Sequence, residues 1–249
     1  MNHRFPARAL NYNPRMSDGS SEPVIDPRWP QLLSLSAHEL RSPLSVVAGY
    51  IRMLLQQRAG PLSDDQLRLL QEAEKSCGRL SAVLAELSEL ARLESGTAPF
   101  NRSSVNLSTV LLEAISSMPA LPDRDLTARL VDGPAIFVHG DAVRLKAAFS
   151  AIIHALLREL VSSTELIVRV APAVHGGTRS TRLGIAEPSR LEDLMRLELS
   201  AFVPFDEWRG GTGLALPIAR RILAAHGATL LGAPGDSKAA ALVILPSIS

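Results

Sequence analysis

The segment Ser36-Ala-His-Glu-Leu-Arg-Ser-Pro-Leu44 lies inside a longer apolar pattern that predicts the fold of the first third of the chain. Apolar residues within 33–54 recur at alternating intervals of four and three positions, which is typical of a helix with one buried face. Residues 70–91 repeat this spacing, and Ser63 before them is a good N-cap residue. The sequence therefore predicts two long helices, packed as a hairpin over residues 30–96.

This hairpin has more apolar residues than two helices can bury against each other. Leu69, Val83, Leu90 and Leu93 form a second apolar stripe on the second helix. Two hairpins packed as a four-helix bundle would cover both stripes. The sequence therefore predicts a homodimer.

The residues after the hairpin have a different pattern. Residues 97–104 form a short polar connector, and residues 105–249 interleave predicted helices with short predicted strands. Helices are expected at 107–118, at 141–160 and in a segment ending at His226, and strands at 135–138, 165–172, 182–185 and 239–245. We expect an α+β fold, in which the hairpin is followed by a mixed sheet covered by helices on one side.

Composition and charge exclude several classes of protein. Lys and Arg number 26 against 25 Asp and Glu, so the net charge of +1 gives no field that would gather nucleic acid. The single cysteine, Cys77, cannot form an internal disulfide, and no apolar run approaches the roughly 20 residues of a membrane span. We expect a cytoplasmic protein without a membrane span or nucleic-acid partner, preceded by a disordered arm at 1–29.

His38 is the first candidate for chemistry, because it lies beside the apolar face of its helix and should face solvent. A neutral imidazole is a competent nucleophile, and Glu39 could hydrogen-bond the ring or remove its proton. Ser42, one turn further along, could orient a water for hydrolysis, while Pro43 removes one helical hydrogen bond. An isolated histidine on a helix is more often simply an exposed surface residue.

Three segments together resemble one family. SAHELRSPL resembles the H box of sensor histidine kinases, HGDAVRLKAAFSAIIHALLREL is similar to their N-box region, and FVPFDEWRGGTGLALPIARRILAAHG is similar to their F and G2 boxes. The resemblance implies a dimerising phosphotransfer hairpin joined to an ATP-binding α/β sandwich. It also implies that His38 accepts phosphate from ATP with Mg²⁺ and passes it to an aspartate in the receiver domain of a response regulator.

The glycine-rich segment 210–214 is the candidate phosphate-binding turn. It precedes a predicted helix, whose first backbone N–H groups have no partner within the helix and can hold phosphate. Phe202 and Phe205 before it either anchor a lid over such a site or belong to the core. The candidate nucleotide contacts are Gly211, Thr212, Gly213, Leu214 and Arg158.

Two positions depart from the family pattern. Ala155 stands where the family has the asparagine that ligates magnesium, and Ala186 stands where it has the aspartate that binds adenine. Glu159 and Glu187 are the nearest substitutes, but a one-residue shift along a strand turns Glu187 to the opposite face. No residue is therefore assigned as a metal ligand.

These departures leave three hypotheses. The first is a histidine kinase that uses ATP, and the second is an ATP-independent histidine phosphotransferase that exchanges phosphate with receiver domains. The third is a pseudokinase regulator that binds receivers without chemistry. In the first two, exposed hairpin residues such as Arg52 and Gln56 are expected to select the receiver.

Overall fold

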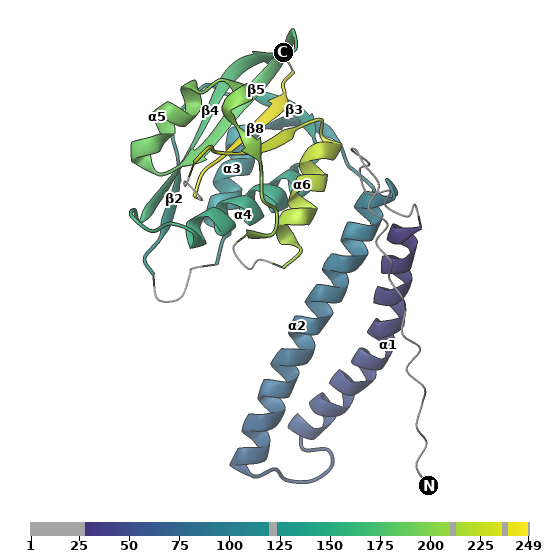
Figure 1. Cartoon of the computed structure of the whole chain (residues 1–249). Helices are drawn as coiled ribbons and strands as arrows, with labels where there is room; N and C mark the ends of the chain where they lie inside the picture. Colours follow the sequence, from purple (N-terminus) through teal and green to yellow (C-terminus); the bar gives the residue numbers. More distant parts are fainter. Residues whose placement is uncertain (1–27, 120–123, 210–212, 236–238, 249) are drawn as a thin grey trace, which may run out of the picture.

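The computed structural model describes residues 28–119, 124–209, 213–235 and 239–248. Nearly all of the arm expected at 1–29 lies outside these ranges. Within them, a long helical hairpin stands below an α/β unit, to which it is joined at the end of its second helix (Figure 1).

The hairpin consists of α1, Trp29–Leu55, and α2, Asp64–Glu94. The side chain of Ser63 accepts from the backbone N–H of Gln66, and the Gln66 side chain accepts in return from the backbone N–H of Ser63. This reciprocal cap satisfies two N–H groups that the helix leaves without a partner. The expected N-cap and the expected hairpin are both confirmed.

The α/β unit contains a two-stranded sheet and a six-stranded sheet. In the small sheet, β1, Ser103–Asn106, pairs antiparallel with β3, Phe137–Gly140. The large sheet has the order β2-β4-β5-β8-β7-β6, and its only parallel pair among the described residues is β2 with β4. Its strands are β2, Thr127–Leu130; β4, Glu165–His175; β5, Thr178–Ala186; β6, Val203–Pro204; β7, Thr229–Gly232; and β8, Ala241–Pro246.

Helices pack on both faces of the large sheet. The main core joins one face to α3, Leu107–Ser116; α4, Ala142–Arg158; and α6, Ala215–Ala225. A smaller core lies on the opposite face under α5, Pro188–Arg196, which follows β5 and precedes a short 3₁₀ turn at Leu199–Ala201. The mixed sheet is confirmed, but the expectation that helices cover one side only is wrong, because α5 covers part of the other side.

Several strands differ in position from those expected from the sequence, and others were not expected at all. The strand expected at 135–138 lies at Phe137–Gly140, directly before Asp141, which caps α4. β1 begins at Ser103, inside the segment expected to be a polar connector. β2, β6 and β7 were not expected, because each has four residues or fewer and therefore too short an alternation to recognise.

Candidate functional site

His38 lies on α1 with 79% of its side chain exposed. The preceding residue, Ala37, is fully buried between the two helices, and this fixes the face on which the imidazole stands. Nδ1 of His38 is 3.6 Å from Oε1 of Glu39, whose side chain is 72% exposed. This distance is longer than a hydrogen bond but within reach of a small rotation of either side chain. The expected exposure of His38 and its proximity to Glu39 are both present.

The hairpin is fixed near His38 by a contact that the sequence did not suggest. The guanidinium of Arg41 donates to the hydroxyl of Ser88 on α2 at 3.0 Å, and that hydroxyl donates to the carbonyl of Leu84 at 2.8 Å. Ser42 is exposed one turn beyond His38, where it is open to water. This contact with α2 therefore limits the rotation of α1, the helix that carries His38.

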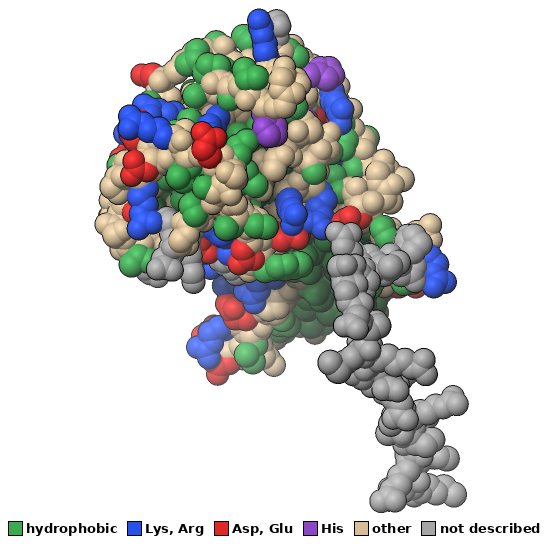
Figure 2. Space-filling view, turned by 45° about the horizontal axis from the view of Figure 1, so that its top comes forward, with side chains coloured by type: hydrophobic (Ala, Val, Ile, Leu, Met, Phe, Trp, Pro, Cys, Tyr) green, Lys and Arg blue, Asp and Glu red, His purple; other side chains and the backbone are tan. Residues whose placement is uncertain are grey.

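Large apolar side chains are exposed along the hairpin. Those at least 45% exposed are Trp29, Leu32, Leu35, Leu40, Val46, Val47, Tyr50, Met53, Leu69, Leu80 and Val83. A soluble monomer seldom exposes so large a contiguous apolar patch. By contrast, basic and acidic side chains are interspersed over the face of the α/β unit in Figure 2. The hairpin is therefore the part of the described chain with an unburied apolar face.

The α/β unit is attached to α2 by two separate ion pairs, Glu89 with Arg144 and Glu94 with Arg221. The Arg144 guanidinium also donates to the carbonyl of Pro99 at 2.9 Å and lies 4.6 Å from the ring centre of Phe100. These four contacts join the end of the hairpin and the connector to α4 and α6. We call Glu89, Glu94, Arg144 and Arg221 the interdomain latch.

Arg221 of the latch also pairs within the α/β unit, with Glu207 at 2.8 Å. Burial alone would lower the pKa of Arg221, but hydrogen bonds to Glu94 and Glu207 outweigh burial and raise that pKa. Arg221 therefore stays charged and bridges α2 to the segment that precedes the glycine-rich turn.

A half-buried histidine, His226, contacts the start of α4 next to the connector. His226 accepts the backbone N–H of Asp141 on Nε2 at 2.9 Å, and Nδ1 lies 2.7 Å from the carbonyl of Ile222, to which it donates. Burial lowers the pKa of His226, and the neighbouring Arg102 and Arg144 lower it further. Asp141 in turn accepts the backbone N–H of Asn101 at 2.8 Å. His226 is therefore a neutral structural residue.

Of the glycine-rich segment 210–214, the structure describes Gly213 and Leu214. Gly211 and Thr212 lie outside the described residues, whereas Leu214 directly precedes α6, as expected. Gly213 has φ of +62°, a conformation in which a side chain would be strained. A Cβ atom built on Gly213 would lie 3.6 Å from Oε2 of Glu86 on α2. A phosphate bound at Gly213 would therefore lie near a carboxylate.

The position from which the family ligates magnesium has no ligand side chain in this chain. Ala155 is fully buried in the main core. Glu159, one turn further on, forms an ion pair with Arg209 at 3.4 Å, and both side chains are only 14% exposed. Arg209 also lies 4.4 Å from the ring centre of Phe205, which is 4% exposed in the core. Glu159 is therefore already paired with a cation from its own chain.

The adenine position is also changed. Ala186 is fully buried in the smaller core. Glu187 is 9% exposed, and both of its carboxylate oxygens accept from the hydroxyl of Ser162, at 3.1 and 3.2 Å. Arg158 is exposed at the end of α4, and Phe202 packs against the smaller core. Glu159 and Glu187, the two candidate substitutes, therefore contact other residues of the chain, Arg209 and Ser162 respectively.

The described residues lack a metal-binding cluster and a membrane-spanning helix. They contain no group of three or more His, Cys, Asp or Glu side chains that could hold a metal ion. No helix in the described ranges has the length and apolar character needed to cross a membrane.

Comparison with known proteins identifies the hairpin. Residues 30–96 match the family model of the His Kinase A (phospho-acceptor) domain. The chain belongs to the sensor histidine kinase family. It is 30% identical over 202 residues to the phosphate regulon sensor protein PhoR of Pseudomonas aeruginosa, a match that covers 78% of this chain and 44% of PhoR.

Other matches extend over most of the chain. It is 24% identical over 237 residues to the cell-division control histidine kinase PdhS of Brucella abortus, covering 87% of this chain and 22% of PdhS. The chain thus spans less than half the length of these relatives.

Two solved structures share the fold. Full-length ShkA, crystallised in complex with AMPPNP, superposes with a TM-score of 0.63 at 19% identity, over 88% of this chain and 46% of ShkA. The histidine kinase AdeS of Acinetobacter baumannii superposes with a TM-score of 0.51 at 18% identity, over 85% of this chain and 98% of AdeS. Both support the arrangement of a helical hairpin followed by an α/β unit.

Proposed function

We propose that this chain is the phosphotransfer and catalytic-type part of a two-component histidine kinase. In this proposal His38 accepts a phosphoryl group and passes it to an aspartate in a response regulator receiver domain. The observation that carries the proposal is the exposed His38 beside Glu39, on a hairpin that matches the phospho-acceptor domain family.

The chemistry proposed for His38 follows from its surroundings. Nε2 attacks phosphorus, the N–P bond forms, and the bond from phosphorus to the leaving oxygen breaks. The ring becomes positive as this happens, and Glu39, 3.6 Å from Nδ1, can stabilise that charge or accept the Nδ1 proton. In the reverse reaction, in which water removes the phosphoryl group, Ser42 is proposed to orient that water.

We further propose that the hairpin forms a homodimer through a four-helix bundle. The exposed residues Leu40 and Val47 are seven positions apart on α1 and lie on one line along the helix. Leu69 and Val83 are exposed on α2. A second hairpin would remove these side chains from water, and each fully buried one would contribute roughly 1.5 to 3 kcal/mol.

ATP with Mg²⁺ is the phosphate source that the family suggests, and ShkA was crystallised with an ATP analogue. The residues described here fit that group poorly. Ala155 and Ala186 offer no polar atom, Glu159 is paired with Arg209, and Gly213 lies near Glu86. These observations favour a second candidate function, in which His38 receives phosphate from a phosphorylated receiver and ATP is not used.

One experiment separates the hypotheses. The purified chain is incubated either with radiolabelled ATP and Mg²⁺ or with a radiolabelled phosphorylated receiver, and His38→Ala serves as the blank. Label from ATP that disappears in the blank supports the kinase, and label from the receiver alone supports the phosphotransferase. Label from neither source would overturn both and favour the pseudokinase regulator.

A further inference from the structure

His226, at the end of α6, belongs to a chain of contacts that reaches the hairpin. Its Nε2 atom accepts the backbone N–H of Asp141 at 2.9 Å. The Asp141 carboxylate in turn accepts the backbone N–H groups of Asn101, at 2.8 Å, and of Arg144, at 3.1 Å. The guanidinium of Arg144 pairs with Glu89 on α2. The imidazole is therefore connected to the hairpin through the start of α4 and the connector.

The hydrogen bonds of this imidazole require its neutral form. Nδ1 lies 2.7 Å from the carbonyl oxygen of Ile222, so Nδ1 carries the proton and donates it. Nε2 faces the N–H of Asp141 and has to be an acceptor. A proton added to Nε2 would place two donors against each other at 2.9 Å. Protonation of His226 therefore breaks its contact with Asp141.

The charged groups around the ring also oppose a positive imidazole. The guanidiniums of Arg102 and Arg144 lie 5.4 and 4.6 Å from the ring centre of Phe100. The His226 ring packs against the same Phe100 ring in a T-shaped arrangement, with 5.4 Å between the centres. Burial lowers the pKa of His226 and both guanidiniums lower it further, whereas a backbone carbonyl and the Asp141 carboxylate act in the opposite direction. The packed ring thus binds a proton less readily than an imidazole in water, whose pKa is about 6.5.

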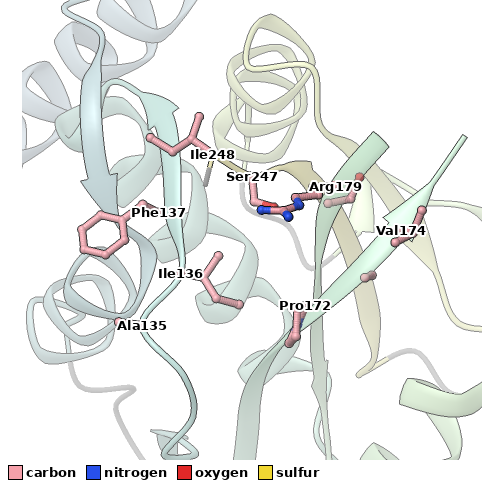
Figure 3. A pocket seen from close by; sticks show the side chains of 10 residues that line it. Ala135, Ile136, Phe137, Pro172, Val174, Arg179, Ser247 and Ile248 are labelled. Atoms are coloured by element: carbon pink, nitrogen blue, oxygen red, sulfur yellow. The ribbon is translucent and has the colours of Figure 1, made fainter. Parts of the chain in front are cut away.

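β3 forms a fixed wall on one side of the ring. A Cβ atom added to Gly140, at the end of β3, would lie 2.9 Å from Cδ2 of His226, so the strand already packs closely against the ring. At the other end of β3, the backbone N–H of Ile248 donates to the carbonyl of Phe137 at 2.9 Å. Figure 3 shows Phe137 and Ile248 beside a surface groove of about 550 Å³. Because β3 is held in this way, a displaced ring would move toward Phe100 in the connector.

We propose that this junction is a proton-operated switch of the interdomain latch. A proton from solvent binds Nε2 of His226, the contact with Asp141 breaks, and the start of α4 and the connector lose the arrangement that directs Arg144 to Glu89. The latch then opens, and the α/β unit is no longer held in one orientation relative to the hairpin. Because the released ring binds protons more readily than the packed one, acid favours the open form and neutral pH favours the closed form. The switch is independent of the source from which His38 receives phosphate.

Pulsed electron paramagnetic resonance on the full chain measures the opening. Spin labels are attached to exposed positions on α2 and α3, by Ser81→Cys and Thr109→Cys in a Cys77→Ser background. The labelled chain is diluted with unlabelled chain, so that only distances within one copy are measured. The distance distribution should be narrow at about pH 7.5 and broad at about pH 5.5, on either side of the ordinary imidazole pKa.

Two substitutions of His226 separate this switch from other effects of acid. His226→Gln brings a side-chain oxygen near the place of Nε2 but does not titrate, so its distribution should stay narrow at both pH values. His226→Lys carries a charge at both pH values and should be broad at both. His154→Gln is the matched control, because His154 is the other histidine whose pKa burial lowers, and it should open like the unsubstituted chain. Circular dichroism checks that each variant is folded.

Amide hydrogen exchange gives a second readout, at the contact itself. Protection of residues 98–103, relative to the unfolded chain under the same conditions, should fall about three- to tenfold at the lower pH, as expected for the loss of one hydrogen bond. The proposal is overturned if the unsubstituted chain gives equally narrow distributions at both pH values. Broadening by acid that persists in His226→Gln, or a narrow distribution in folded His226→Lys, would overturn it as well.

Discussion

The hairpin and the α/β unit of this chain differ in how completely they keep the features of their family. The hairpin has the full segment from Ser36 to Leu44, with His38 exposed and its helix fixed by the contact of Arg41 with Ser88. The α/β unit has the family fold, but alanines stand at two nucleotide positions. The difference shows that the fold of the unit does not depend on the residues that would bind nucleotide, since core packing holds it together.

The interdomain latch attaches the α/β unit to the hairpin through contacts within the chain that need no nucleotide. Arg144 and Arg221 attach the unit to Glu89 and Glu94 of α2, one to two turns from Glu86, which lies near Gly213. Such an attachment fixes the orientation of the unit relative to the hairpin. The unit can therefore act as a positioned surface beside the phosphotransfer helix.

The largest expected effect concerns the hairpin alone. His38→Gln should abolish phosphate incorporation from every source, because the glutamine amide is not a nucleophile for phosphorus. Incorporation of label, measured after separation from free label, checks this. His175→Gln, at the exposed end of β4, is the control and should retain full labelling.

The next largest effect concerns self-association. Val47→Glu places a charge in the exposed apolar stripe and should convert a dimer to a monomer, because an unpaired charge is costly to bury. Sedimentation velocity measures the change. Val161→Glu, at a position that is 92% exposed on the α/β unit, should leave the dimer intact. A dimer that persists in Val47→Glu would place the interface elsewhere.

A smaller effect is expected at the latch. Arg144→Ala removes an ion pair, a hydrogen bond and a ring contact, and should lower the free energy of unfolding by about 2 to 3 kcal/mol. Urea unfolding followed by Trp208 fluorescence, in a Trp29→Phe background, reports this loss. Arg129→Ala breaks an exposed pair with Glu165 and should cost under about 1 kcal/mol.

The smallest effect is a pH dependence in the α/β unit. Burial lowers the pKa of His226, so below about pH 6.5 the unfolded chain binds more protons than the folded one. The stabilisation is therefore present above that pH and is lost as the pH falls. The urea midpoint of His226→Asn should fall less steeply between about pH 7.5 and 5.5 than that of the unsubstituted chain.

His154 has a lowered pKa for the same reason, burial, with a further contribution from Arg158. His154→Asn should therefore remove a separate part of the slope. An unchanged slope in both variants would mean that neither imidazole is held neutral by the fold.

The sequence predicted those features that rest on local periodicity and capping. The spacing of apolar residues in 33–54 and 70–91 is enough to predict the hairpin, and Ser63 with Gln66 caps α2 by a contact three residues apart. Residue patterns also gave the order of several later elements, and the resemblance drew attention to Ala155. These features depend on residues close together in the chain.

The remaining features depend on contacts between distant residues. Glu89 and Arg144 are 55 positions apart, and Glu94 and Arg221 are 127 apart, so no local pattern could pair them. The ion pair of Glu159 with Arg209 spans 50 positions. α5 was missed because its nine residues give too short an apolar pattern to recognise, although Pro188 suits the start of a helix.

The most direct test of the central claim is to locate the phosphate on the chain. The labelled protein is kept at alkaline pH, where phosphohistidine survives, and is digested and sequenced by mass spectrometry. The account predicts phosphate on His38 and loss of that phosphate on brief acid treatment. Acid-stable phosphate on a serine or threonine, or phosphate on another histidine such as His154, would contradict it.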